Sequence, residues 1–591
     1  MTERGTEWVT EREEQERTFV TYDGEELFYR CWPAAEPRAG AVLLLHRGHE
    51  HSGRMAHLAD ELALPSHAVY AYDARGHGRS PGERGDAPSF SAWVRDLDAF
   101  VRHLEVAEGL PAADLAIVAQ SVGAVVAAAW VHDYAPTIRA LVLASPAFRV
   151  RLYVPFARPG LAALRALFGR FFVTSYVRAS MLTHDEQRVE SYDADPLVTR
   201  PISVDLLLGL AHAGDRLVDD ARAITTPTLL LVSGADAVVE HGPQHAFFVG
   251  LGSRTKERHV LPGFFHDTLG ERDRAPVVAM VRRFLDDRFA LPVEQHSWLE
   301  ADRRSYTRDE AEALATPVPP LSLAGLWWQL ARTSLQVGAW LSEGLAVGQR
   351  TGFDSGASLD YVYRDEARGL GPLGRMADRL YLNQVGWRGI RQRKQLVEEL
   401  LAEALRRLAE AGERRVVLDI AAGHGRYVLD ALAASAHPPH AVVLRDLDEA
   451  NVAAGRRLIA ARGLDDVVSF VPGDAFDADD VAATEPRPTL GVVSGLYELF
   501  GDNPQVSRSL QGLARAIPPG GYLVTTCQPW HPQLELIARS LTSHRDGAAW
   551  VMRRRTQAEM DQLVAAAGFT KVAQRVEEGG LFTVTLARRD G

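Results

Sequence analysis

The segment Ala119–Gly123 (Ala-Gln-Ser-Val-Gly), centred on Ser121, constrains the fold more than any other part of this sequence. An apolar run that predicts a strand, residues 115–119, leads into it, and a helix of small residues, 124–130, is expected to follow. A serine on such a tight strand-to-helix turn presents its Oγ at the top of a sheet when its neighbours are small. Because serine alone is a poor nucleophile, this turn requires an acid and then a histidine later in the chain.

Asp236 and His266 occur in that order. Asp236 follows the apolar run 228–232 and a glycine turn, and His266 follows a short predicted strand at 259–261. In such a triad the histidine takes the serine proton, and the carboxylate holds the imidazole in the correct tautomer. Many other histidines occur in this half of the chain, so chain order and local context are what favour His266.

Length, charge and cysteine content limit the classes of protein. A chain of 591 residues is too long for one hydrophobic core, so several domains are expected. The formal net charge of −12 comes without any block of Lys or Arg, which argues against a nucleic-acid partner. Cys31 and Cys527 suggest no disulfide framework, and residues 1–17 lack the apolar segment of a secretory signal. We therefore predict a cytoplasmic protein.

The alternation of strand and helix patterns predicts two α/β domains. The first spans residues 18–289, and within it residues 146–226 are expected to form a helical cap that contains no strand. Residues 290–374 are expected to be a helical connector, and residues 375–591 the second domain. The expected strands are 27–32, 41–45, 68–73, 115–119, 140–144, 228–232 and 259–261 in the first domain, and 416–420, 441–445, 467–471, 490–494 and 522–527 in the second.

Three more segments of the first domain carry a family resemblance. Residues 46–54 (HRGHEHSGR), 73–80 (DARGHGRS) and 192–197 (YDADPL), together with Ser121, resemble the monoacylglycerol lipases and lysophospholipases of the α/β-hydrolase superfamily. The resemblance implies an α/β-hydrolase fold and a serine hydrolase that cleaves a lipid-like ester. It also implies an oxyanion hole made by the backbone N–H groups of Gly48 and Val122.

Two residues depart from the pattern of this superfamily. Arg47 stands beside the expected oxyanion hole where the family has glycine, and it either reorients the loop or brings a cation near the substrate. Ala119 replaces the first glycine of the serine turn, and alanine is small enough for that position.

A second glycine-rich turn, Asp419–Gly425 (DIAAGHG), lies between a predicted strand and a predicted helix. No lysine follows it in the phosphate-binding pattern, which argues against a nucleoside triphosphate. Asp446 ends the next strand and is placed to hold ribose hydroxyls, and Asp474 follows the third strand. Together these features resemble the class I methyltransferases that use S-adenosylmethionine, which have a Rossmann-like fold.

The resemblance implies a set of cofactor-binding residues. Gly423 and Gly425 would approach the methionine part of the cofactor, Asp446 the ribose, and Asp474 with the Ala475 N–H the adenine. Ala421 stands where the family usually has its first glycine. The full set is Asp419, Ala421, Gly423, Gly425, Asp446, Asp474 and Ala475.

Two further features concern the acceptor and the segment before the second domain. Residues 381–391 resemble a segment found in methyltransferases that are fused to hydrolases of this type. Candidates for the methyl-acceptor site, placed only by their position after the fourth and fifth strands, are Tyr497, Glu498, Gln528, Trp530 and His531.

Two apolar segments allow two interpretations each. Residues 321–348 predict an amphipathic helix that either packs between domains or contacts a membrane peripherally. The cap segment 154–177 either packs in the core or acts as a lid against a fatty chain or a membrane surface.

The sequence therefore predicts a bifunctional enzyme: a serine ester hydrolase and a methyltransferase that uses S-adenosylmethionine on an unknown acceptor. The alternative is a hydrolase whose second domain is a catalytically silent cofactor-binding or scaffolding module. The expected partner is a small-molecule or lipid-like ester, with peripheral contact to the inner membrane left open. No metal site is predicted, since no Cys/His cluster has metal-ligand spacing.

Overall fold

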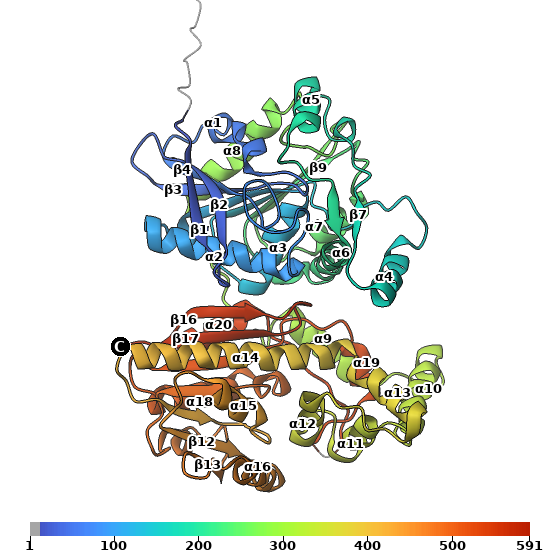
Figure 1. Ribbon diagram of the computed structural model, residues 1–591, viewed down its shortest axis with the longest axis vertical. Coiled ribbons are helices and arrows are strands. Elements are labelled where there is room, and N and C mark those ends of the chain that lie inside the picture. The colour runs from blue at the N-terminus through green and yellow to red at the C-terminus, as the bar shows by residue number, and fades with distance from the viewer. Residues whose placement is uncertain (1–11, 546) are drawn as a thin grey trace, which may run out of the picture. The chain divides into compact units, whose positions relative to one another are not determined.

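The computed structural model describes residues 12–545 and 547–591, and these residues divide into two compact units between His296 and Ser297 (Figure 1). Each unit has its own sheet and core and is described by itself. In the described ranges, no helix has both the length and the apolar character needed to cross a membrane.

The first unit is built on an eight-stranded sheet with the order β1-β2-β4-β3-β5-β6-β9-β10. β1 and β2 are antiparallel, β2 is antiparallel to β4, and the remaining neighbours are parallel. This topology confirms the α/β-hydrolase fold, although the edge strand β1 was not predicted. The strands are β1 (Gln15–Val20), β2 (Glu26–Trp32), β3 (Gly40–Leu45), β4 (His67–Tyr72), β5 (Leu115–Gln120), β6 (Ala140–Ala144), β9 (Thr228–Ser233) and β10 (Lys256–Leu261).

Helices cover both faces of this sheet because its central strands are buried on both sides. The helices α1 (His57–Glu61) and α8 (Ala275–Phe289) pack on one face. On the other face, Phe100 of α2 (Phe90–Glu108) packs against rings from β1, β2 and β4. The helix α3 (Val122–Tyr134) is apolar all round, and every residue from Gly123 to Tyr134 is buried.

The segment between β6 and β9 forms the cap, and one expectation about it was wrong. It contains two short strands, β7 (Phe172–Thr174) and β8 (Pro201–Ser203), which pair antiparallel. Each is only three residues long, so the sequence carries no alternating pattern that could reveal it. The cap helices are α4 (Ala157–Phe168), α5 (Glu186–Ala194) and α6 (Val204–Asp219).

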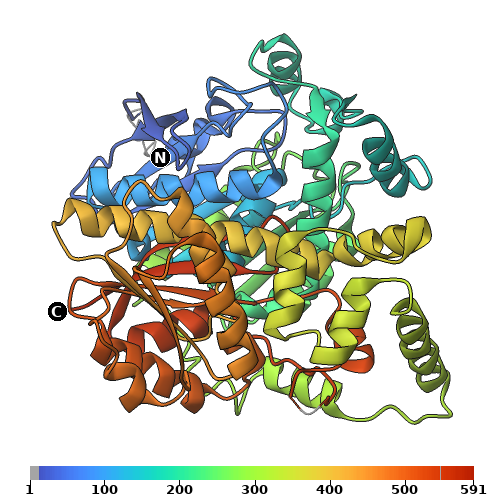
Figure 2. The same cartoon turned by 60° about the horizontal axis from the view of Figure 1, so that its bottom comes forward.

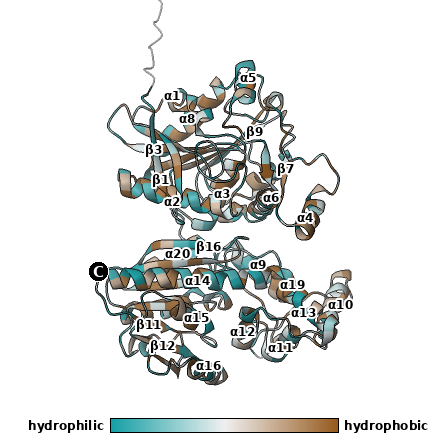
Figure 3. Ribbon diagram, in the orientation of Figure 1, coloured by the Kyte–Doolittle hydropathy of each residue, from teal (hydrophilic) through white to brown (hydrophobic). Residues whose placement is uncertain are grey.

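The cap helix α4 is exposed rather than packed into a core. None of its residues is buried, although the ribbon of this helix carries brown, apolar residues in Figure 3. The exposed apolar residues here include Phe156, Leu164, Leu167 and Phe168.

The second unit is built on a seven-stranded sheet with the order β13-β12-β11-β14-β15-β17-β16. The first five strands are parallel, and β17 returns antiparallel between β15 and β16. This is the Rossmann-like arrangement that the resemblance implied, while the β16–β17 hairpin was not predicted. The strands are β11 (Val416–Asp419), β12 (Ala441–Asp446), β13 (Val468–Pro472), β14 (Leu490–Val493), β15 (Tyr522–Cys527), β16 (Phe569–Val576) and β17 (Thr583–Arg589).

The helices that precede this sheet belong to the same unit. The long helix α14 (Val385–Glu410) buries a stripe that includes Val397, Leu401 and Leu408 in the core formed with the sheet. Figure 2 shows it running along the sheet, with α10 on the rim of the unit. The preceding helices are α9 (Tyr306–Ala315), α10 (Leu323–Gly338), α11 (Glu343–Thr351), α12 (Gly356–Arg364) and α13 (Gly371–Leu382), and those after β11 are α15 (Arg426–Ala434), α16 (Glu449–Arg462), α17 (Ala478–Ala482), α18 (Asn503–Ala516), α19 (Leu534–Ser540) and α20 (Gln557–Ala566).

Gly123 supplies a test of how α3 packs. A Cβ at this position would lie 2.5 Å from the carbonyl oxygen of His46 and 2.9 Å from that of Leu45. We expect Gly123→Ala to destabilise the protein by about 1–3 kcal/mol or more, because neither backbone oxygen can move without shifting β3. Thermal and urea unfolding would measure the loss. Gly160→Ala on α4 meets no atom within 4 Å and should be neutral or slightly stabilising; equal effects of the two variants would contradict the packing argument.

Candidate functional site

Ser121 occupies the turn between β5 and α3 in an unusual backbone conformation, with φ of 55° and ψ of −115°. Few non-glycine residues adopt such a conformation unless the structure on both sides holds them in it. Here the Ser121 N–H donates to the Ala144 carbonyl at 2.9 Å, and its carbonyl accepts from the Ala147 N–H at 3.1 Å. The serine is therefore held at the end of the strand.

The three residues predicted to form a triad are joined by hydrogen bonds. His266 Nε2 lies 2.8 Å from Ser121 Oγ, and His266 Nδ1 lies 2.8 Å from Asp236 Oδ2. With the Nδ1 proton donated to the carboxylate, Nε2 is free to accept from the serine hydroxyl. All three side chains are buried.

Asp236 is held in place and kept ionised by its neighbours. Its Oδ1 accepts from the backbone N–H groups of Val238, at 2.7 Å, and Val239, at 3.0 Å. Burial by itself would raise the pKa of Asp236, but the His266 ring and these N–H donors outweigh it and hold the pKa below its ordinary value. The carboxylate is thus available to stabilise a positive imidazolium.

Gly48 and Val122 lie next to each other beside this serine. A Cβ on Gly48 would lie 3.0 Å from Val122 Cγ2, so only a residue without a side chain allows this close approach. Val122 is the first residue of α3, and the N–H groups of the first helical turn have no partner within the helix. Both residues line a small cavity of about 30 Å³ behind the serine turn.

The structure decides between the two interpretations of Arg47. Its guanidinium is buried and bonded to the Glu50 carboxylate, with a second carboxylate, that of Asp267, at 3.4 Å. Burial would lower the pKa of Arg47, but these two carboxylates outweigh it and raise the pKa well above its usual value. The cation is therefore neutralised inside the protein, where its role is to hold the loop. No sequence pattern identified Asp267 as its partner.

The three segments of the family resemblance meet in space. His51 Nε2 lies 2.9 Å from Asp195 Oδ2, and the Arg54 guanidinium lies over the Tyr192 ring at 5.4 Å. Asp73 accepts from the N–H groups of Ser52, at 2.6 Å, and Arg79, at 2.8 Å. The loops around the serine turn and the cap segment 192–197 thus form one connected structure.

In the second unit the structure brings the glycine-rich turn and Asp446 together. The Gly423 N–H donates to Asp446 Oδ2 at 2.8 Å, and the Ala421 N–H donates to Asp419 Oδ1 at 3.3 Å. Gly423 and Gly425 have φ of 57° and 72°, which glycine adopts without strain. A Cβ on Gly423 would meet only one neighbouring atom within 4 Å, at 3.6 Å, so the turn leaves room for a ligand.

Asp474 and Ala475 follow β13, next to Asp446. The Gly473 N–H donates to the Asp446 carbonyl at 3.1 Å. The Asp474 side chain is exposed and caps the following turn by accepting from the Phe476 N–H at 2.9 Å. Ala475 is buried beside Phe476, whose ring packs edge-on against Phe500. An acceptor oxygen next to an apolar wall fits an adenine, so these residues suit the implied cofactor.

A helix that sequence reasoning did not connect with this site contacts the glycine-rich turn. Asp360 of α12 accepts from Arg426 Nε at 2.5 Å and lies 3.5 Å from His424 Nδ1. The start of the same helix supplies the one atom near Gly423, the Cα of Gly356. Only tertiary contact reveals this role, because α12 precedes the turn by about 60 residues.

The carboxyl group of Asp419 is fully buried at the end of β11. Burial raises its pKa to about 7, the nearby Asp446 adds to this, and the bonds from the Tyr427 hydroxyl and the Ala421 N–H partly oppose it. Asp419 is therefore partly protonated near neutral pH.

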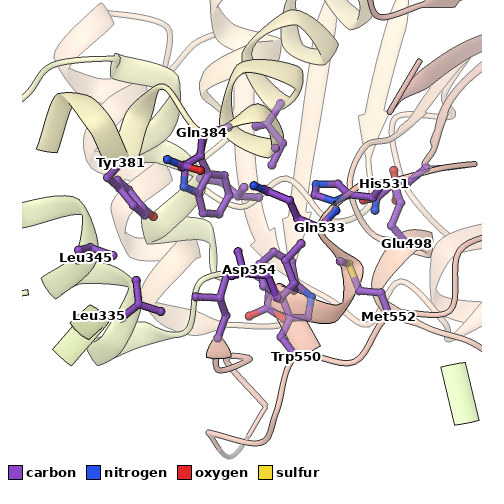
Figure 4. Close-up of a pocket in the computed structure, with 18 of the residues that line it drawn as sticks. Leu335, Leu345, Asp354, Tyr381, Gln384, Glu498, His531, Gln533, Trp550 and Met552 are labelled. Atoms are coloured by element: carbon purple, nitrogen blue, oxygen red, sulfur yellow. Dashed lines mark hydrogen bonds between the residues drawn. The ribbon is translucent and has the colours of Figure 1, made fainter. Parts of the chain in front are cut away.

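A cavity of about 400 Å³ lies beside the carboxyl ends of β14 and β15 (Figure 4). Of the predicted acceptor-site residues, Glu498, Gln528 and His531 line it. Tyr497 is buried elsewhere, with its hydroxyl donating to Ser509 Oγ at 3.0 Å, and Trp530 packs against a neighbouring apolar cluster. Helices α10, α11, α13 and α14 supply the opposite wall, which sequence reasoning did not include.

The buried Asp419 predicts a pH dependence of stability. Its pKa is about 7 when folded and about 4 when unfolded, so the folded state binds more protons between these values. The contribution of Asp419 to the unfolding free energy is therefore lost as pH rises from about 4 through 7. We expect the isosteric Asp419→Asn variant to gain a few kcal/mol relative to wild type across this window, as measured by urea unfolding. Exposed Asp465→Asn is the control, and a constant difference for Asp419→Asn would contradict the prediction.

Comparison with known proteins supports both halves of this description. Residues 36–273 match the family model described as "Serine aminopeptidase, S33", and residues 281–589 match the model described as "Putative methyltransferase". A monoacylglycerol lipase of Mycolicibacterium smegmatis is 28% identical over 44% of this chain and 94% of its own length. The crystal structure of a monoacylglycerol lipase from Paleococcus ferrophilus covers 47% of this chain and 99% of its own, with 24% identity and a TM-score of 0.40.

One relative matches both halves together. The Escherichia coli (strain K12) protein YnbC is 52% identical over 97% of this chain and 98% of its own length. The first half is thus a hydrolase domain that resembles monoacylglycerol lipases. Over more than half of its length the chain matches the methyltransferase model, and it belongs to the family that this model describes as "Putative methyltransferase".

Proposed function

We propose that this protein is a bifunctional enzyme. Its hydrolase domain, residues 18–289 with a cap at about 146–226, cleaves a lipid-like ester. Its methyltransferase domain, residues 375–591 preceded by the helical segment 290–374, uses S-adenosylmethionine. The observation that carries the first activity is the hydrogen-bonded chain from Ser121 through His266 to Asp236, with both bonds at 2.8 Å.

The geometry supports nucleophilic catalysis by Ser121. Oγ attacks the ester carbonyl while His266 Nε2 takes its proton, and the backbone N–H groups of Gly48 and Val122 receive the developing negative oxygen. His266 then gives the proton to the departing alcohol, and water releases the acyl group by the same steps in reverse order. Asp236 stabilises the imidazolium in both halves of the reaction.

A lipid-like substrate fits two observations. Several relatives that cover the hydrolase half are named monoacylglycerol or monoglyceride lipases. The cap helix α4 exposes Leu167 and Phe168, which are each 76% exposed and supply an apolar surface for a fatty chain or a lipid surface. We therefore propose peripheral contact of this cap with membranes.

In the second unit, Asp446 would hold the ribose hydroxyls of the cofactor, Asp474 and the Ala475 N–H its adenine, and the turn from Ala421 to Gly425, beside Asp419, its methionine part. When bound, the cofactor supplies an electrophilic methyl group. The open space over Gly423 and the exposed Asp474 carboxylate support this assignment.

The hydrolase assignment is tested by substitution of the triad. We expect Ser121→Ala to lower kcat for hydrolysis of a monoacylglycerol by at least about four orders of magnitude and to abolish labelling by a fluorophosphonate probe. Ser66→Ala, whose hydroxyl donates to Glu36 on the surface, is the matched control and should keep full activity. Full labelling of Ser121→Ala would place the nucleophile elsewhere.

Cofactor binding is tested by calorimetry. We expect S-adenosylmethionine to bind the wild type. Asp446→Asn should raise the Kd of the cofactor by about 10- to 100-fold, because the ribose hydroxyls lose their hydrogen bonds to a charged acceptor. Exposed Asp465→Asn should bind as wild type does. If the wild type binds no cofactor, the second domain is a scaffolding module; if it binds cofactor but methylates no acceptor, it is a silent binding module.

A further inference from the structure

We propose that the 400 Å³ cavity of the second unit binds the methyl acceptor, and that this acceptor is a phenol-type amphiphile, a ring with an acidic hydroxyl and a hydrocarbon chain. The inference rests on the proposed methyl transfer and names its substrate class. The cavity has the size of a site for a small organic molecule. Figure 4 shows Glu498 and His531 at one end and Leu335 and Leu345 at the other.

The cavity is lined by buried polar groups that lack a hydrogen-bond partner. Arg393 Nε, Gln528 Nε2, Trp550 Nε1 and Glu498 Oε2 have no hydrogen-bond partner within the described part of the chain. All four side chains are more than nine-tenths buried and line the cavity. A buried polar atom without a partner costs about 1–3 kcal/mol, so a ligand that supplies partners is stabilised here.

His531 adds a further donor at this end. Burial lowers its pKa to about 4, so the ring is neutral at physiological pH. The Gln533 N–H donates to His531 Nδ1 at 3.0 Å, which leaves the ring proton on Nε2. The cavity therefore presents N–H donors together with the Glu498 Oε2 oxygen, while the other lining carboxylate, Asp354, already accepts from Ser543 and the His544 N–H.

This set of groups selects the head of the ligand. Glu498 Oε1 lies 3.6 Å from Arg393 Nη1, so the two opposite charges already offset each other. A carboxylate head would add a second anion beside Glu498, and an ammonium head would add a second cation beside Arg393. A hydroxyl satisfies both kinds of group, because its proton is donated to Glu498 Oε2 while its oxygen accepts from the N–H donors.

The aromatic walls and the strength of the base favour a phenol over an aliphatic alcohol. A carboxylate base assists removal of a proton more effectively from a phenol, whose pKa is about 10, than from an alkanol, which is far less acidic. Tyr381, Trp387, Trp550 and Phe582 line the cavity, with the two tryptophan rings nearly parallel at 6.4 Å between centroids. Such walls suit a planar ring.

The other end of the cavity opens onto an apolar surface. Leu380 of α13 lines the cavity and is 60% exposed, which places it at the rim. The helices α10 and α13, which supply Leu335 and Leu380 to the cavity wall, also carry exposed apolar residues. A hydrocarbon chain that leaves the cavity here stays in apolar surroundings. These residues are Leu323, Leu326, Trp327, Leu330 and Val337 on α10, and Leu373, Met376 and Leu380 on α13.

The polar end lies where a methyl donor can reach it. Gly495 and Glu498 follow β14, which is the immediate parallel neighbour of β11, the strand that leads into the cofactor turn. The carboxyl ends of parallel strands share one edge of the sheet. The phenol oxygen takes the methyl group, the carbon–sulfur bond electrons stay on sulfur, which becomes neutral, and Glu498 Oε2 receives the phenol proton.

The first measurement is binding of 4-dodecylphenol, delivered from cyclodextrin, to the full chain without cofactor. Titration calorimetry should show one site. Ala331→Trp narrows the apolar end and should raise the Kd of 4-dodecylphenol by about tenfold or more, since each displaced methylene is worth about fourfold, while leaving 4-ethylphenol within about threefold. A melting curve confirms that the variant is folded.

The second measurement uses deuteromethyl-labelled S-adenosylmethionine and mass spectrometry of the product. Glu498→Gln should lower kcat for methylation of 4-dodecylphenol by about 10²- to 10⁴-fold. It should raise the Kd by only about tenfold, the loss expected for one hydrogen bond to a charged acceptor, so turnover falls more than binding. Exposed Glu535→Gln on the neighbouring α19 is the matched control and should match wild type in both assays.

The outcomes separate this inference from the function on which it rests. If S-adenosylmethionine does not bind the wild type, the methyltransferase proposal fails, whether or not 4-dodecylphenol binds. If it binds but 4-dodecylphenol does not, or if Ala331→Trp leaves its Kd unchanged, the acceptor inference is overturned alone. Equal or better methylation of dodecanoate or 1-dodecanol overturns the phenol head.

Discussion

Both units depend on the turn that connects a central parallel strand to the helix after it. At this turn the chain reverses within a few residues, and the first N–H groups of the helix have no partner inside the helix. In the first unit the turn holds Ser121 with φ of 55°, and in the second it holds Gly423 and Gly425 with positive φ. Small residues are required there because the backbone of the helix approaches its neighbours closely: a Cβ added at Gly123 would lie 2.5 Å from the His46 carbonyl oxygen. The residues that we propose for catalysis and for cofactor binding gather at this edge of each sheet because the strands end there.

Buried ion pairs hold the loops that surround these turns. Arg47 with Glu50 and Asp267 in the first unit, and Asp360 with Arg426 in the second, place opposite charges in contact away from water. Removing one partner of such a pair leaves an uncompensated buried charge, which is strongly destabilising. The pairs therefore determine loop position more than they add to net stability, and they explain how the loop can carry Arg47 next to Gly48, which we propose as an oxyanion-hole donor.

The unpaired groups in the second unit contrast with this pattern. Most buried polar atoms in proteins have partners, so four buried polar atoms around one cavity without a partner among the described residues support the ligand site that we propose. The polar and apolar ends of that cavity come from different parts of the chain, the first from β14, β15 and α14 and the second from α10 and α13. The amphipathic helix α10 therefore contributes to two surfaces: Leu335 lines the cavity, and Trp327 is exposed on the outside of the unit.

The central strands and the order of the motifs could be predicted from sequence alone, because buried parallel strands are continuous apolar runs and the turn residues follow them directly. Ser121, Asp236, His266, the Asp419–Gly425 turn and Asp446 were all found in this way, and the structure brings each group together. Sequence alone did not predict four features of the fold, because polar or short strands carry little alternating pattern of their own. These are the edge strand β1, the three-residue strands β7 and β8, and the β16–β17 hairpin. The partners of Arg47, the contact of α12 with the glycine-rich turn and the wall of the cavity were decided only by tertiary structure. The Arg47–Asp267 and Asp360–Arg426 contacts join residues 220 and 66 positions apart, and local sequence holds no signal for which distant side chains will meet.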